Sequence, residues 1–118
     1  MGSKVAIEKV KSDDYEGINE ALIRAIEDIG GIDDIIKPGF KVLVKPNMVA
    51  VPTGRLSGAV TRAELARAVC ELVKRRGAMP IVAESASVGA DTEDVILFCG
   101  YDELRQKGFE VIDLKKQN

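Results

Sequence analysis

The chain has 118 residues, of which 46% are hydrophobic and 31% are charged, and its formal net charge is −2. This balance is typical of a globular domain and argues against an intrinsically disordered chain. The near-neutral charge and the absence of Trp argue against a nucleic-acid-binding surface. No apolar run approaches the roughly 20 residues that cross a membrane, so we expect a cytoplasmic chain without membrane or nucleic-acid partners.

Cysteine and histidine usage limits the possible chemistry. Cys70 and Cys99 stand apart without a CxxC motif, and the chain contains no His. This pattern is typical of a reducing compartment and does not indicate a disulfide framework. We expect each cysteine to be a small buried core residue, with metal ligation or redox chemistry as the alternative. Without His the commonest general base and metal ligand are missing, so no metal site is predicted and no catalytic residue is assigned.

Short apolar runs alternate with segments of helical periodicity. In chain order we expect a strand at 4–10, a helix at 13–29, a helical turn at 32–37, a strand at 41–45, a helix from 61 to 76, a strand at 80–84, a helix at 92–99, a short helix at 101–107 and a strand at 109–114. Thr61 with Glu64, and Asp13 with Glu16, have the spacing of helix-capping boxes.

This order of elements predicts an α/β fold. We expect a mainly parallel sheet of about four strands with helices on both faces, a three-layer α/β/α and Rossmann-like arrangement. The sequence does not determine the order of the strands in the sheet. We expect one domain over residues 1–118, and its polar end at 115–118 suits a boundary inside a longer protein as well as a natural terminus.

The second predicted strand ends in Lys45-Pro46-Asn47. Pro46 keeps Lys45 extended, so the direction of the lysine side chain is largely fixed. Asn47 offers both a hydrogen-bond donor and an acceptor. Because ligands of open parallel sheets bind beyond the carboxyl ends of the strands, Lys45 and Asn47 are predicted ligand-binding residues. The simpler alternative is that Lys45 only extends its charge into solvent.

A long connection follows, from Pro46 to Val60, where strand-to-helix connections usually have about 2 to 6 residues. Its Gly, Ser and Pro residues and Arg55 suit the wrapping of an anion by backbone N–H groups and one guanidinium. The helix that begins at Thr61 would add the positive pole of its N-terminus. We therefore predict Arg55 and Thr61 as ligand-binding residues, with capping alone as the alternative for Thr61.

The third predicted strand ends at Glu84, and small residues beginning with Ser85 follow. Glu84 could act as a base or ligand, and Ser85 could contact polar ligand atoms, so both are predicted site residues. The alternative is that Glu84 only forms an ion pair with Lys45. No GxGxxG, GxxxxGK[ST] or GxSxG motif is present, so dinucleotide-binding, P-loop and hydrolase functions lack support.

Four segments in order, VLVKPNMV, AELARAVCELVKRRGA, PIVAESASVG and DTEDVILFCGYDELRQKGFEVIDL, resemble the N-terminal half of the domain of unknown function 362 family. The family often has His-Pro after the helix-opening Thr, whereas this chain has Arg62-Ala63. The resemblance implies an α/β domain in a longer protein, and many members carry ferredoxin-like modules with four-iron–four-sulfur clusters. This chain has no cluster motif, so we expect no cofactor here and a cluster only in other parts of a longer protein. The positions that match the family pattern are Lys45, Pro46, Asn47, Thr61, Glu84 and Ser85.

Two functions remain open from the sequence. The first is an anion-binding domain of a redox- or metal-associated enzyme, with residues 48–60 as a lid over a small carboxylate or phosphate. The second is a non-catalytic scaffold or interaction module that docks a C-terminal partner domain or another copy of the chain. Whether the protein is an enzyme is not decided by these residues.

Overall fold

The computed structural model describes residues 2–117. Its elements, in chain order, are α1 (Tyr15–Asp28), β1 (Lys41–Val44), α2 (Ala63–Arg75), β2 (Met79–Glu84), α3 (Thr92–Phe98), α4 (Asp102–Gln106), β3 (Glu110–Asp113) and a 3₁₀ turn, η1 (Leu114–Lys116). None of the helices in this part of the chain is long and apolar enough to cross a membrane.

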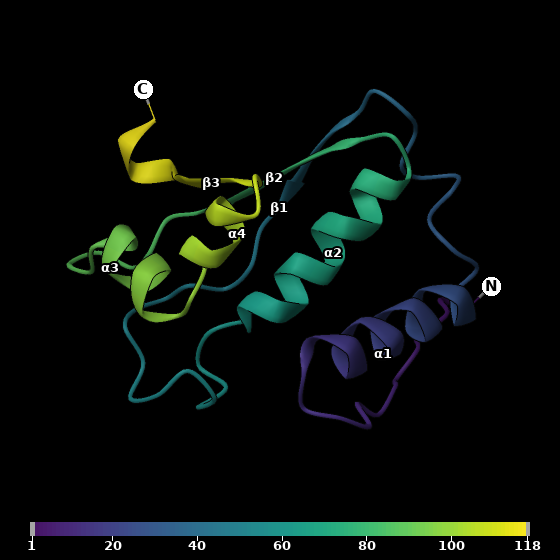
Figure 1. The fold of residues 1–118 in the computed structure, drawn as a ribbon, viewed down its shortest axis with the longest axis horizontal. Coiled ribbons are helices and arrows are strands. Elements are labelled where there is room, and N and C mark those ends of the chain that lie inside the picture. Colours follow the sequence, from purple (N-terminus) through teal and green to yellow (C-terminus); the bar gives the residue numbers. More distant parts are fainter. Residues whose placement is uncertain (1, 118) are drawn as a thin grey trace.

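The strands form one open sheet in the order β1-β2-β3, and both neighbouring pairs are parallel. The predicted α/β class with a parallel sheet is confirmed, but the sheet has three strands rather than about four. Right-handed crossovers between successive neighbours place the helices that link them on the same face. Figure 1 shows α2, α3 and α4 on one side of the sheet, with α1 beyond α2. We expected helices on both faces of the sheet, whereas within residues 2–117 they lie on one face; this arrangement is compatible with a three-layer α/β fold.

The strand predicted at 4–10 is wrong, because the structure assigns no strand to these residues. Their alternating apolar pattern suits a strand, but a strand also requires a hydrogen-bonded neighbour. Glu8 instead forms an ion pair with Arg24 on α1 at 2.8 Å, and Val5 and Ile7 lie exposed. The segment therefore lies against a helix and not at an edge of the sheet.

The residues at which α1 and α2 begin differ from the predicted ones. At α1 the cap is Asp14, one residue after the predicted Asp13, and its carboxylate accepts a bond from the Gly17 N–H at 2.8 Å. At α2 the predicted cap by Thr61 is wrong, since Arg62 holds the cap position and no side chain caps the helix. The N-terminus of α2 therefore keeps N–H groups without a side-chain acceptor.

One hydrophobic core lies between the sheet and the helices. Val82 and Val111 from the strands pack with Cys70 of α2 and with Val95 and Leu104 of α3 and α4. Both cysteines are free and buried, so the prediction that they are core residues is confirmed. Burial raises the pKa of Cys70 to about 11, so this thiol stays protonated and unreactive near neutral pH.

The opposite face of the sheet is left open. Strand side chains alternate between faces, and the side away from the helices carries Leu43, Met79, Ile81 and Ile112, which we call the open sheet face. Leu43 is 57% exposed and Met79 is 54% exposed. Parallel sheets are normally covered on both faces, and each such side chain left half exposed forgoes on the order of 1 kcal/mol.

Tyr101 connects the helical layer to the start of α2. Its side chain is fully buried, and its hydroxyl donates a hydrogen bond to the Thr61 carbonyl at 2.7 Å. Burial raises the pKa of this phenol, so it remains a donor across the physiological range. The bond joins two segments that are 40 positions apart in the sequence.

We expect Tyr101→Phe to lower the free energy of unfolding by about 1 kcal/mol, because the partly buried Thr61 carbonyl loses its hydrogen-bond donor. Chemical denaturation of both proteins measures the difference. Tyr15→Phe is the matched control, since it keeps the ring that stacks on Arg67, and it should change stability by less than about 0.5 kcal/mol. Equal stability of Tyr101→Phe and the wild type would show that this bond contributes nothing.

Candidate functional site

Lys45 and Glu84 meet at the carboxyl edge of the sheet. The register of β1 and β2 pairs Val44 with Val82, which brings the two strand ends together. Lys45 Nζ donates to Glu84 Oε2 at 2.7 Å, and the Ser85 N–H donates to Glu84 Oε1 at 2.8 Å. The structure therefore brings three predicted site residues together. The ion pair between Lys45 and Glu84, which was the alternative to a ligand site, is also present.

The Glu84 carboxylate is held in its charged form. Burial alone would raise the pKa of Glu84, since its side chain is 9% exposed. Hydrogen bonds from Lys45 and from the Ser85 N–H, with the lysine charge, outweigh burial and lower this pKa below its usual value. A charged, paired carboxylate is a poor proton acceptor at neutral pH, so a general-base role for Glu84 gains no support.

Asn47 and Thr61 close the base of the long loop. The Asn47 N–H donates to Thr61 Oγ1 at 3.0 Å, and the Thr61 N–H donates to the Asn47 carbonyl at 3.0 Å. Asn47 Nδ2 also donates to the Ala59 carbonyl at 2.7 Å, and Met48 pairs with Val60 in an antiparallel bridge. We call this closure the loop neck. It already engages Asn47 Nδ2 and Thr61 Oγ1. A ligand role for either residue stays a prediction.

Arg55 lies at the far end of the loop, apart from Lys45. Arg55 Nε donates to the Phe98 carbonyl at 2.6 Å, and Arg55 Nη1 lies 3.7 Å from Glu103 Oε1. Gly100 makes this possible, because a Cβ there would sit 2.9 Å from Arg55 Nη1. The φ of Gly100 is +81°, which also favours glycine. The guanidinium therefore reaches the turn between α3 and α4, and not the edge of the sheet.

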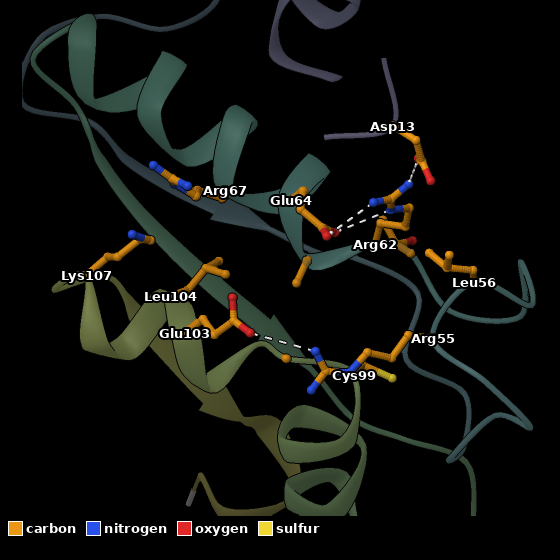
Figure 2. A pocket seen from close by; sticks show the side chains of 13 residues that line it. Asp13, Arg55, Leu56, Arg62, Glu64, Arg67, Cys99, Glu103, Leu104 and Lys107 are labelled. Atoms are coloured by element: carbon orange, nitrogen blue, oxygen red, sulfur yellow. Dashed lines mark hydrogen bonds and ion pairs between the residues drawn. The ribbon is translucent and has the colours of Figure 1, made fainter. Parts of the chain in front are cut away.

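A cavity of about 410 Å³ lies beside Arg55, between the loop, the start of α2 and the α3–α4 turn. We call it the loop cavity. Figure 2 shows the side chains that line it. The predicted site residues that line it are Arg55 and Thr61, whereas Lys45, Asn47, Glu84 and Ser85 do not line it.

The loop cavity carries four cations and three carboxylates. The full set is Arg55, Arg62, Arg67 and Lys107, with Asp13, Glu64 and Glu103. Arg62 pairs with both Asp13 and Glu64, and its hydrogen bonds lower the pKa of Glu64 while the carboxylates raise the pKa of Arg62. Arg67 and Lys107 have no carboxylate partner within residues 2–117.

Arg67 is held in place without an ion pair. Its guanidinium stacks 3.7 Å from the ring centre of Tyr15, and its Nε is buried with no hydrogen-bond partner among the described residues. Figure 2 shows Arg67 and Lys107 well apart from the Arg62 ion pairs. One part of the cavity therefore keeps positive charge that the protein itself does not neutralise.

The sequence interpretation missed Asp113 as well as Arg67 and Lys107. Asp113 ends β3 in register with Glu84 and is buried, and the rule that selected Glu84 at a strand end would have selected it too. Arg67 and Lys107 lie on α2 and just after α4, where basic residues are usually solvated. No local motif marks them, because the cavity forms only when the two helices and the loop come together.

The residues do not fit an iron–sulfur cluster. A four-iron–four-sulfur cluster takes four thiolates, whereas this chain has two cysteines, and burial raises the pKa of both. Among residues 2–117 no three Cys, Asp or Glu side chains gather as metal ligands. No role for such a cluster is assigned to these residues.

We expect Lys45→Ala to lower the free energy of unfolding by about 1 kcal/mol at pH 7, a modest value because Lys45 is largely exposed. The lowered pKa of Glu84 contributes stability above its usual value of 4.5, which is lost as the pH falls through the lowered pKa. Without Lys45 this pKa rises, so the loss on acidification should begin at a higher pH. Denaturation from pH 7 to pH 3, with Lys41→Ala as the control, measures both effects, and identical curves would refute the stabilising role of the pair.

Comparison with known proteins assigns the chain to a family. Residues 42–118 match the family described as "Domain of unknown function (DUF362)". A thylakoid-associated protein of Synechocystis sp. is 33% identical over 89 residues, which are 72% of this chain and 27% of the relative. The chain thus spans about a quarter of that relative, and the predicted cytoplasmic location stays a prediction. No solved structure matches the chain. The resemblance seen in the sequence is confirmed, and the chain belongs to the DUF362 family.

Proposed function

We propose that this chain binds a small anion, a carboxylate or phosphate group, in the loop cavity, as the ligand-binding part of a larger DUF362 enzyme. The observation that carries the proposal is the unneutralised charge of Arg67 and Lys107 on one cavity. Arg67 is half-buried, whereas Lys107 is exposed. A half-buried cation without a partner is costly, and an anionic ligand beside both side chains would supply the missing partner.

The start of α2 supports the same ligand. Thr61, Ala63 and Glu64 line the cavity, and no side chain caps this helix. Its first N–H groups and its positive pole favour an anion, and they add to the neighbouring guanidinium groups. The volume of about 410 Å³ lies within the range of about 300–1,000 Å³ that small-molecule sites occupy.

The proposed anion site lies away from the sheet edge but has the chemistry predicted from the sequence. Arg55 and Thr61 remain in it, and residues 48–60 form one wall of the cavity. Lys45 and Glu84 neutralise one another at the sheet edge, so they offer less net charge to a ligand. An anion at Lys45 would first have to displace a buried carboxylate.

The test is titration of the isotopically labelled chain with inorganic phosphate and, separately, with succinate, followed by amide NMR. We expect the Ala63, Glu64 and Gly100 resonances to shift with at least one probe. Arg67→Gln/Lys107→Gln should weaken that binding at least tenfold, which corresponds to the loss of one or two charge-assisted hydrogen bonds.

A matched control separates site contacts from net charge. Lys41→Gln/Arg75→Gln removes the same charge from two exposed residues outside the loop cavity, and it should change the Kd by less than about twofold at 0.15 M salt. Shifts confined to Lys45, Asn47 and Ser85 would place the anion at the sheet edge and refute the cavity proposal. The absence of any shift near the cavity would refute it as well.

A further inference from the structure

The open sheet face is an unpartnered apolar surface, independent of the loop cavity. Alternation along the strands sends Val42, Val44 and Val82 toward the helices and the opposite set to the other face, where Leu43 and Met79 are more than half exposed and Ala83 is buried. Among the helices, α2 and α4 make the most extensive contacts with the sheet, and α1 packs on α2. Figure 1 shows no helix of the described chain on the other side of the sheet.

We infer that this face seats an α-helical layer contributed by the part of a DUF362 polypeptide that lies outside the matched region. The matched segment is 27% of the Synechocystis relative, so most of that polypeptide is available to supply such a layer. A helix is the fitting occupant, because both faces of a parallel sheet are covered by helices in α/β folds.

The size of the face favours a tethered helix over a separate molecule. Three strands of four to six residues present about 14 Å by 20 Å, on the order of 300 Å². Stable complexes of separate proteins need about 800 Å² from each partner, so a second copy of this chain gains too little area here. One or two helices, each about 10 Å wide, cover the face, and a covalent connection removes much of the entropic cost of association.

The rim of the face specifies the charge of the occupant. Lys41 begins β1 and Glu110 begins β3, and both are exposed on the same side as Leu43 and Ile112. The covering helix should therefore carry an apolar stripe, with a carboxylate toward Lys41 and a basic residue toward Glu110. This complementarity fixes its direction across the sheet.

Cysteine labelling tests the inference in two intact proteins. Leu43→Cys is made in this chain, and a cysteine is placed at the position of the Synechocystis relative that aligns with Leu43. The native thiols Cys70 and Cys99 are buried, so they react slowly with N-ethylmaleimide. Mass spectrometry of the modified peptides gives the labelling rate under native conditions.

We expect labelling at position 43 to be at least tenfold slower in the relative than in this chain. Arg75→Cys, exposed on α2, is the matched control and should label within twofold in both proteins at the aligned position. Met79→Cys repeats the test on the same face if circular dichroism shows that Leu43→Cys has lost structure.

Equal rates at position 43 would overturn the inference. It would also fail if Leu43→Cys in this chain labelled slowly and became faster on dilution, because a second copy would then cover the face. Neither labelling rate depends on anion binding. The outcome of this test is therefore independent of the function proposed for the loop cavity.

Discussion

The exchange of hydrogen bonds between Asn47 and Thr61 determines where the long loop goes. Each backbone N–H of this pair finds its acceptor in the other residue, at 3.0 Å in both directions. The neck holds the end of β1 against the start of α2, and the residues between them must fold as a closed excursion. The Thr61 hydroxyl accepts a hydrogen bond in the loop neck and does not cap α2, which is therefore left without a side-chain cap. The same bonds thus shape the loop and expose the helix terminus.

The closed neck separates two polar regions that the sequence places together. At the sheet edge, Lys45 and Glu84 satisfy one another, and the lysine covers a buried carboxylate. At the tip of the loop, Arg55 crosses to the α3–α4 turn over Gly100 and encloses a cavity with excess positive charge. The ion pair at the sheet edge is expected to stabilise the fold, whereas the loop cavity contains cations without a carboxylate partner. The anion site that we propose therefore lies over the helices and not at the strand ends.

Local and regular features were predictable from the sequence. The helix predicted at 13–29, observed as α1, the strand predicted at 41–45, observed as β1, and the meeting of Lys45 with Glu84 follow from periodicity and parallel topology. The strand at 4–10 failed because pairing depends on a distant neighbour. The Thr61 cap failed because Asn47 competes for its hydroxyl, and the direction of Arg55 depends on the space left by Gly100. Arg67 and Lys107 become neighbours of one cavity only through tertiary packing.

Amide hydrogen exchange at the loop neck tests the central claim most directly. Exchange at Asn47 and Thr61 should be slowed to the level of the β1 amides, and Thr61→Val should restore fast exchange at Asn47 while β2 stays protected. The side-chain oxygen is the acceptor that this substitution removes. Exchange at Asn47 in the unmodified chain as fast as at Gly54, in the middle of the loop, would contradict the account.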